Sequence, residues 1–534
     1  MTPTKPPSPL LRGLLGLLLL LPACGLCTVD QLWLTIGTFT NSLTDSKLGF
    51  DGEFIGITNY AHLFDDRFFP ASLGYTTLLI IVHILAAAIL PPLLAVAVNS
   101  FGKKSQRNAR LWFTLPLAYF GPALVMFGPA FLRGLWNVES LERSYLLLDG
   151  LVTLAVACGV GLVVYLAVLR GRTGEDGTSP VASLVVTWVL TQLAVAAYAL
   201  QSFNILSATM SGRGGNFVLG QMLLQTIRNG QIGLTSAVSF VMLLFASLFG
   251  IAATLTIILS RLQLKHKVES ESEQTASGGA NIPGRIAVVL GGVAALFVTL
   301  LPLFWGLFKA LTTEGASIDL GEMLRFGVNS ILPALLTILF IQLPVAYLGA
   351  IGIGAVKPFG KASSWLLLPF APWLFVTAVP LGMAAFERYR GLDLINSSLS
   401  LIPPILLSVP LLFILTLFFN GQSQAWQAAV DEGMPAMRAF VQKMFIPSLP
   451  LALFMSAVTL LAAAQEAFMP FMVGIRLDQS TISVAILQLI GRMDFAGLSQ
   501  LITLFGLPIF VTFFVIFAAL QVSYLDKLVI VREA

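Results

Sequence analysis

The sequence predicts an all-α membrane protein that crosses the bilayer many times. Of its 534 residues, 57% are hydrophobic and only 10% are charged, and the mean hydropathy is +0.89. Soluble domains carry about 25% charged residues, so the 30 basic and 26 acidic side chains are too few to cover a water-exposed surface. This composition excludes soluble, disordered, collagen-like and disulfide-stapled classes and leaves a polytopic helical protein.

About twelve apolar stretches are long enough to cross a membrane, for which a helix needs about 20 residues. We expect six on each side of a central polar segment, as two six-helix bundles. Proline and glycine inside several stretches are tolerated in membrane bundles and mark kinks. The expected spans are Leu14–Ile36, Leu73–Val98, Leu111–Phe131, Leu146–Leu169, Val181–Leu206, Leu234–Leu262, Ile286–Leu311, Phe326–Ile353, Trp365–Phe386, Ile395–Phe419, Ile446–Val473 and Leu501–Val522.

The central polar segment covers residues 263–283. It contains serine and glycine and has no apolar periodicity, which is typical of a linker. It divides the chain into a first half, residues 1–262, and a second half, residues 284–534. Inside loops of membrane proteins are rich in Lys and Arg, and the stretches Lys103–Arg110 and Arg261–Lys267 are strongly basic. We therefore expect both termini and the linker in the cytoplasm.

The sequence has few residues that could form a nucleic-acid-binding, metal, catalytic or redox site. The net charge of +4 gives no reason to expect nucleic acid as a partner, and three scattered histidines leave little for a metal site or a catalytic triad. Cys24 and Cys27 lie inside an apolar stretch, where packing is favoured over redox chemistry. The run ending at Cys24 resembles a lipoprotein signal, but it continues to Ile36, which favours a first span.

Residues 422–453, QSQAWQAAVDEGMPAMRAFVQKMFIPSLPLAL, form an amphipathic stretch that precedes an apolar span. The pattern predicts a short helix, a turn at Gly433 and a second short helix outside the bilayer. The apolar face of such an element can dock into a groove on a partner. An ordinary amphipathic loop at the membrane surface is the alternative.

This stretch resembles the EAA loop of binding-protein-dependent ABC importer permeases. Gln427 stands where that family has glutamate, and the Ile-Pro pair comes one residue late. The matching positions are Gln427, Ala428, Ala429, Gly433, Phe440, Ile446 and Pro447. In the family this loop is the coupling element that fits the ATP-binding subunit.

The flanking segments resemble the two subunits of maltose-type sugar permeases. Residues 392–411 and 462–473 are similar to the smaller subunit, and residues 51–69 and 208–225 are similar to the larger one. The resemblance implies a type I ABC importer transmembrane fold with both permease subunits fused in one chain. The first half, however, has only RGRTGEDGTSP, residues 170–180, where the family has another EAA loop. The resemblance therefore implies that one of the two coupling elements has been lost.

The resemblance implies a permease without catalytic residues, metal or cofactor of its own. No G-x-x-x-x-G-K-[ST] loop is present in the sequence, so a pair of partner ATPase subunits would use ATP and Mg²⁺ at the cytoplasmic face. An extracytoplasmic solute-binding protein would deliver a sugar or sugar-like solute. The expected location is the inner (cytoplasmic) membrane of a bacterium.

Polar residues within spans are costly in lipid and normally face a cavity or another helix. We therefore select Gln201, Asn204, Gln465 and Glu466 as candidates for the substrate pathway, with Gln192 as a further polar residue in a span. For each, an interhelical hydrogen bond is the alternative.

Two other functions remain open. A secondary transporter of 6+6 topology would need embedded groups that couple to an ion or proton. A non-transporting membrane regulator derived from such a permease would be compatible with the lost loop. An intramembrane enzyme is the least favoured reading, because no paired carboxylates or H-E-x-x-H motif occur.

Overall fold

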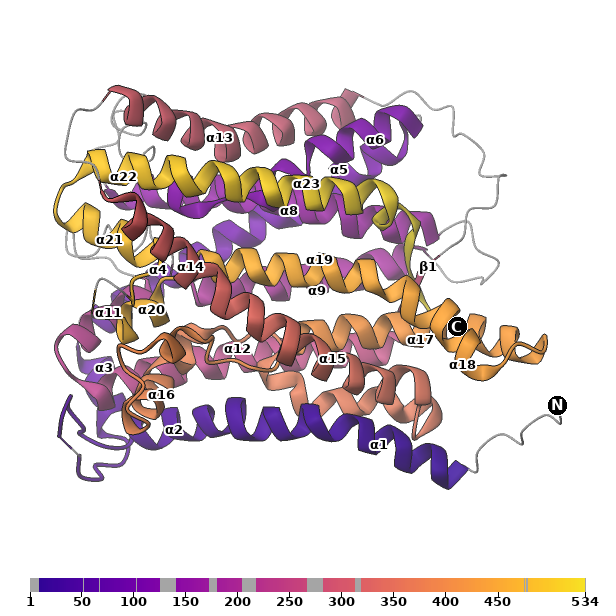
Figure 1. Cartoon of the computed structure of the whole chain (residues 1–534), viewed down its shortest axis with the longest axis horizontal. Coiled ribbons are helices and arrows are strands. Elements are labelled where there is room, and N and C mark those ends of the chain that lie inside the picture. Colours follow the sequence, from indigo (N-terminus) through magenta and orange to yellow (C-terminus); the bar gives the residue numbers. More distant parts are fainter. Residues whose placement is uncertain are drawn as a thin grey trace.

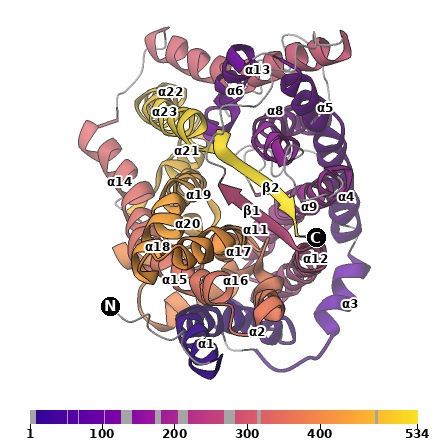
Figure 2. The same cartoon turned by 90° about the vertical axis from the view of Figure 1, so that its right-hand side faces the viewer.

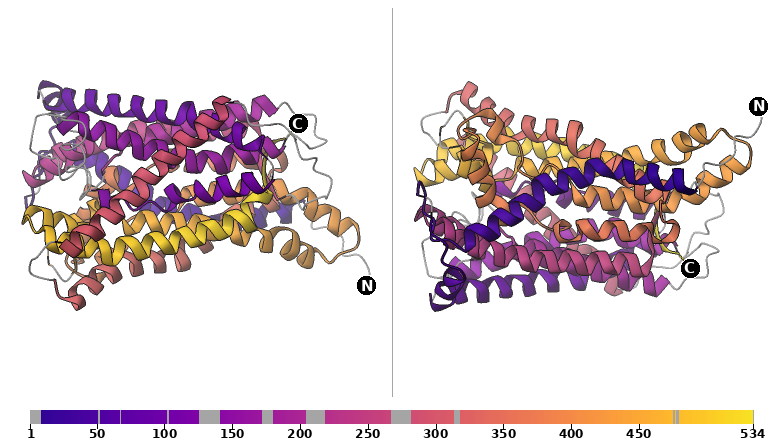
Figure 3. Two further views of the ribbon diagram at one scale, coloured as in Figure 1. Left: turned by 90° about the horizontal axis from the view of Figure 1, so that it is seen from above. Right: turned by 90° about the horizontal axis from the view of Figure 1, so that it is seen from below.

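The computed structural model describes residues 9–50, 52–66, 68–101, 103–124, 141–171, 180–203, 218–266, 282–312, 318–474, 476 and 479–533. The long helices lie side by side in one bundle (Figures 1 and 3). In this part of the chain, nine helices are long and apolar enough to cross a membrane, or ten if one bent pair counts as a span. The all-α polytopic class is therefore confirmed.

The long helices of the first half follow the expected spans closely. Leu11–Ser42 and Phe68–Asn99 are each continuous over 32 residues, which is long enough to cross about 30 Å of hydrocarbon with some tilt. The elements of this half are α1 (Pro9–Leu26), η1 (Cys27–Leu32), α2 (Trp33–Ser42), α3 (Thr58–Asp65), α4 (Phe68–Ala88), α5 (Leu90–Asn99), α6 (Lys103–Trp112), η2 (Leu115–Ala118), η3 (Gly121–Ala123), α8 (Leu141–Arg170), α9 (Pro180–Leu200), α11 (Leu219–Arg228), α12 (Ile232–Ser260) and β1 (Leu262–His266).

The second half repeats this order of long helices, with a bent third segment and a helical hairpin after the fourth. Its elements are α13 (Ile282–Thr312), α14 (Leu320–Thr337), η5 (Ile338–Gln342), α15 (Leu343–Ala350), η6 (Ile351–Val356), η7 (Gly360–Trp373), α16 (Ala378–Gly391), η8 (Ser398–Leu401), α17 (Val409–Asp431), α18 (Ala436–Phe440), η9 (Val441–Phe445), α19 (Ile446–Ala464), α20 (Phe468–Val473), α21 (Ile482–Gly491), α22 (Phe495–Leu501), η11 (Ile502–Gly506), α23 (Leu507–Ser523), η12 (Leu525–Lys527) and β2 (Leu528–Arg532).

Four expected spans are not single helices. Ile446–Val473 is interrupted at residues 465–467, between α19 and α20. In Leu111–Phe131, α6 ends at Trp112 and two 3₁₀ turns follow, each containing a proline, while residues 125–131 lie outside the described part. In Ile395–Phe419 the α-helix begins only at Val409, because Pro403 and Pro404 supply no backbone N–H for a helix. The third segment of the second half, η7 with α16, is bent by 74°.

The first helices of the two halves are exchanged. The helix α1 packs on α15 and η6 of the second half, and α13 packs on α5 and α8 of the first half. Small residues permit this: a Cβ atom on Gly352 would lie 2.6 Å from the carbonyl oxygen of Gly16, and one on Gly291 would lie 2.9 Å from the ring of Phe113. Close approach at small residues is common where membrane helices associate.

One end of the bundle is rich in positive charge, and we call it the basic end. It is the right-hand end in Figure 1, where α1 begins and β2 ends. The helix ends, turns and strands there carry Arg12, Arg107, Arg110, Arg170, Arg261, Lys265, Arg285, Lys357, Lys361, Arg438, Lys443, Lys527 and Arg532. Their acidic neighbours in the same segments are Asp431, Glu432, Asp526 and Glu533.

The expected linker begins later than residue 263. Leu262–His266 form the strand β1, which pairs antiparallel with β2 from the end of the chain. Residues 267–281 of the linker lie outside the described part, and α13 already begins at Ile282. The only sheet among the described residues is therefore a two-stranded ribbon built from both halves.

Candidate functional site

A helical hairpin extends beyond the other helices at the basic end (Figures 1 and 3). It consists of the last part of α17, a turn at residues 432–435 and α18. We call residues 420–446 the coupling hairpin, a name taken only from the loop that this stretch resembles in sequence. The helix α17 changes from an apolar stretch ending at Phe419 to a polar one starting at Asn420, yet it continues unbroken to Asp431. Gln422 and Ser423 are still buried, and the polar part from Gln424 onward stands outside the apolar body of the bundle.

Gly433 closes the first arm of the hairpin. Its φ of +95° is in the left-handed region, where glycine avoids the steric cost of a Cβ atom. The N–H groups of Glu432, Gly433 and Met434 donate to carbonyl oxygens of residues 428–430, so the last carbonyls of α17 are satisfied, as at other glycine-terminated helices.

The two arms are joined by Trp426. Its indole N–H donates to the carbonyl oxygen of Ala436 at 3.1 Å, and its ring meets that of Phe440 edge-on, with 6.0 Å between the centroids. Ala429 and Ala439 are buried. Gln427, Ala428 and Gly433 are exposed, and Met437 is the most exposed large apolar side chain of the hairpin at 73%.

The structure brings together most of the residues predicted for the coupling loop. Gln427, Ala428, Ala429, Gly433 and Phe440 all lie on the hairpin, while Ile446 and Pro447 lie at its base, where α19 starts. The prediction of two separate short helices was wrong. The second arm runs through the π-helical turn η9 into α19 as one helix from Ala436 to Ala464, because Pro447 lies at the start of α19 after the wider turn.

Gln201 connects the two halves deep in the bundle. It is the first residue after α9 and is 3% exposed. Its amide nitrogen donates to the carbonyl oxygens of Ala197 and Phe375, at 2.9 and 2.8 Å. Its amide oxygen accepts from the backbone N–H of Thr377 at 2.7 Å. The two partners in the second half lie at the bend between η7 and α16.

Gln465 makes the equivalent connection in the opposite direction. It is the first residue after α19. Its amide nitrogen donates to the carbonyl oxygens of Leu461 and Tyr119, both at 3.1 Å, and its amide oxygen accepts from the N–H of Gly121 at 2.7 Å. These two partners in the first half lie at the break between η2 and η3.

The remaining pathway candidates differ in their surroundings. One carboxylate oxygen of Glu466 accepts from the N–H groups of Phe468 and Met469, at 2.8 and 3.2 Å, and so caps α20. Asn204 lies outside the described residues. Gln192 in α9 is 9% exposed, and neither its amide nitrogen nor its amide oxygen has a hydrogen-bond partner among the described residues. A buried amide in this state is costly unless a ligand or water satisfies it.

Two buried contacts of ionisable residues were missed in the sequence. Asp30 is 1% exposed within the first span and accepts from the guanidinium of Arg388 at 3.2 Å and from the N–H of Leu406 at 2.7 Å. Nε2 of His83 lies 2.9 Å from a carboxylate oxygen of Asp149. The signal was available, because an acidic or imidazole side chain in the middle of a span is a functional-site hypothesis by default.

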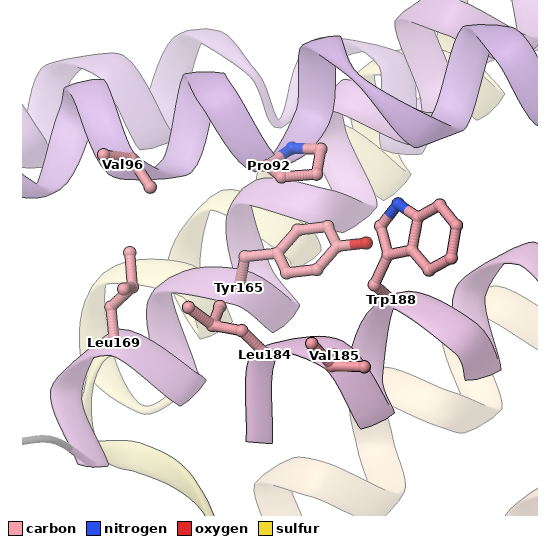
Figure 4. Close-up of a pocket in the computed structure, with 7 residues that line it drawn as sticks. All are labelled: Pro92, Val96, Tyr165, Leu169, Leu184, Val185 and Trp188. Carbon is pink, nitrogen blue, oxygen red and sulfur yellow. The ribbon is translucent and has the colours of Figure 1, made fainter. Parts of the chain in front are cut away.

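An apolar groove lies between α5, α8 and α9 (Figure 4). Its largest side chains are Tyr165 and Trp188, and the indole N–H of Trp188 donates to the carbonyl oxygen of Ala88 at 3.0 Å. The lining residues are Pro92, Val96, Tyr165, Leu169, Leu184, Val185 and Trp188. This lining suits a lipid acyl chain better than a polar solute, since few polar groups converge on it.

No group of three or more His, Cys, Asp or Glu side chains in the described ranges is arranged to hold a metal ion. The site that stands out is therefore the coupling hairpin together with the glutamine contacts between the halves. The chain matches no protein-family model, no curated protein and no solved structure.

Proposed function

We propose that the chain is the membrane permease of an ATP-driven importer for sugars or sugar-like solutes. The observation that carries this proposal is the coupling hairpin, an exposed helical hairpin at the basic end with Gly433 at its tip. The Trp426–Phe440 contact joins the two arms of the hairpin. A partner bound to the hairpin can therefore move α17 and α19 together. Partner ATPase subunits would grip it.

The topology we propose has twelve crossings, counting the broken third segment of each half and α17 as spans. The basic end would face the cytoplasm, because Lys and Arg concentrate on that side of membrane proteins. Both termini would then be cytoplasmic, in the inner membrane of a bacterium. An extracytoplasmic solute-binding protein would load the opposite end of the bundle.

Alternating access would come from motion of one half against the other. Two states biased by nucleotide at one end and by the loaded binding protein at the other are sufficient for this. The paired contacts of Gln201 and Gln465 lie at bends where the halves meet, and Gln192 offers an unsatisfied amide to a solute in the same region of α9. Coupling would be asymmetric, because the corresponding sequence of the first half, residues 170–180, is too short for a second hairpin.

The test is whether an ATPase binds to the chain through the hairpin tip. The tagged chain is purified from its native cells in mild detergent, and Mg²⁺-dependent ATP hydrolysis is measured in the eluate. Met437→Glu should lower the co-purifying ATP hydrolysis at least tenfold. Phe359→Glu is the matched control, since Phe359 is also an exposed apolar residue of the basic end, at 55%, but lies off the hairpin. Equal loss in both variants, or no activity with the unaltered chain, would count against the importer.

A second candidate is an ion-driven secondary transporter, and the His83–Asp149 contact favours it. A carboxylate and an imidazole 2.9 Å apart inside the bundle can share or exchange a proton. Purified chain in vesicles distinguishes the two functions. Uptake driven by a proton gradient without ATP, and lost in Asp149→Asn, supports the secondary transporter; uptake that needs the ATPase and ATP supports the importer. Absence of uptake under both conditions supports a non-transporting regulator.

A further inference from the structure

The two strands of the ribbon are exchanged between the halves. The strand β1 follows α12 of the first half but packs on α17 of the second, whereas β2 ends the second half but packs on α8 and α9 of the first. They pair over five residues, from Leu262 opposite Arg532 to His266 opposite Leu528. Seen from the basic end, the ribbon lies across the middle of the bundle between helices of the two halves (Figure 2).

Charged side chains fix β2 and the residues before it to the first half. The guanidinium of Arg170, at the end of α8, donates to the carbonyl oxygens of Leu525, Asp526 and Leu528 at 2.8 to 3.1 Å. Arg110 forms an ion pair with the carboxylate of Asp526. These contacts hold the start of β2 against the first half. Charge-assisted hydrogen bonds of this kind are stronger than neutral ones.

At the end of β2, further side-chain hydrogen bonds join the ribbon to the first half. The guanidinium of Arg532 donates to the carbonyl oxygen of Ser260 at 3.1 Å, and the amide of Gln263 donates to the carboxylate of Glu533 at 3.0 Å. A separation of the halves at the basic end would therefore have to break this set of contacts or slide one strand along the other.

Two glycines show how closely the strands are seated. A Cβ atom on Gly421 of α17 would lie 2.3 Å from the carbonyl oxygen of Leu264, and one on Gly171 would lie 3.0 Å from that of Ile530. In each case the close neighbour is a backbone atom of the strand from the opposite half. Any larger residue at position 421 must displace β1.

We propose that the β1–β2 ribbon is a latch that closes the basic end of the bundle and releases when the two halves separate there. The sequence has only RGRTGEDGTSP, residues 170–180, after α8, which is too short for a second hairpin. The end of α8 instead holds β2 through Arg170 and Gly171. The latch gives the two halves a preferred closed arrangement at this end. It rests on the proposed function for the force that opens it.

A disulfide across the ribbon tests whether release is required. Leu264→Cys and Ile530→Cys face each other in the register, and Cys24, Cys27 and Cys158 are replaced by alanine. Oxidation should lower ATP-driven uptake at least tenfold, and reduction should restore it. The control pair Thr44→Cys with Phe54→Cys joins another antiparallel bridge, within the first half alone, and should leave uptake unchanged. Wild-type uptake by the oxidised Leu264–Ile530 pair would overturn the latch.

A second measurement needs no transport. Spin labels at Val181→Cys in α9 and Gln442→Cys in η9 report the distance between the halves at the basic end in lipid nanodiscs. Gly421→Ala should add a longer distance to the distribution, whereas Gly74→Ala, a helical glycine with open space around it, should not. An unchanged distribution in Gly421→Ala overturns the latch. If the distance responds but no ATP-driven uptake is found in the unaltered chain, the latch stands and the proposed function fails.

Discussion

Gln201 and Gln465 make the same set of hydrogen bonds from opposite halves of the chain. Each follows the last residue of a long helix, and each amide nitrogen donates to the carbonyl four residues earlier and to a carbonyl of the other half. Each amide oxygen accepts from the N–H two residues beyond that carbonyl, at Thr377 and Gly121. The halves are therefore joined at two equivalent points, both where a helix is broken.

Replacing either glutamine by leucine should destabilise the fold. Gln201→Leu leaves the carbonyl of Phe375 and the N–H of Thr377 without this partner, and Gln465→Leu does the same at Tyr119 and Gly121. Loss of a partner to buried polar groups costs roughly 1–3 kcal/mol. The measurement is the unfolding transition in detergent. Gln424→Leu, an exposed glutamine on the coupling hairpin, is the control, and equal effects in all three variants would show that the inter-half bonds do not stabilise the chain.

The spans could be predicted where the sequence is apolar without interruption. Leu73–Val98 lies within the helix Phe68–Asn99, since apolar length alone decides such a span. The same criterion failed at Ile395–Phe419. That stretch is apolar, but its prolines supply no N–H groups, so its backbone forms short turns before α17 begins.

The polar residues of the site could be selected from sequence, but their partners could not. Gln201 and Gln465 were identifiable because amides are costly within spans. Their partners are backbone groups more than 170 residues away, at breaks in the other half, and backbone groups carry no sequence signal. The contact of His83 with Asp149 depends likewise on the packing of α4 against α8.

Gln192 offers a test that separates structure from transport. Its buried amide makes no hydrogen bond among the described residues, so Gln192→Leu removes none of the protein's described hydrogen bonds and should leave the free energy of unfolding unchanged or higher by up to about 2 kcal/mol. If the amide serves the solute, uptake should nevertheless fall at least tenfold. Stability and uptake are measured on the same preparation. A stable variant with normal uptake would remove Gln192 from the pathway.

The turn at Gly433 should be needed for coupling but not for folding. Proline at this position cannot adopt a φ of +95° and removes the N–H that donates to the carbonyl of Val430. Gly433→Pro should abolish ATP-driven uptake. Gly360→Pro is the matched change, because Gly360 also has a positive φ and donates to a carbonyl three residues earlier. The sequence suggests a further comparison at Gly174, in the first half, where an equal disruption should do little. Similar loss of uptake at either control position would mean that the hairpin is not the coupling element.

The ribbon should loosen as the pH falls below about 6.5, the ordinary pKa of histidine. Burial and the positive charge of Lys527 lower the pKa of His266, whose ring stacks on Tyr524 at 5.2 Å between centroids. Lys265 precedes His266 in the strand, and the amide of Gln422 donates to the carbonyl oxygen of His266. The folded state therefore takes up the proton less readily than the unfolded state. Stability contributed by the neutral ring is complete above pH 6.5 and is lost as the pH falls towards the lowered pKa.

The change should be well below about 1.4 kcal/mol per pH unit, because the half-buried ring is partly screened by solvent. Unfolding of the unaltered chain and of His266→Gln is compared at pH 7.5, 6.5 and 5.5. The unaltered chain should lose stability relative to the variant across this range. In the chain labelled at Val181→Cys and Gln442→Cys, the population with the longer distance should increase at pH 5.5 only when His266 is present. A variant that follows the unaltered chain at every pH would show that this histidine does not control the ribbon.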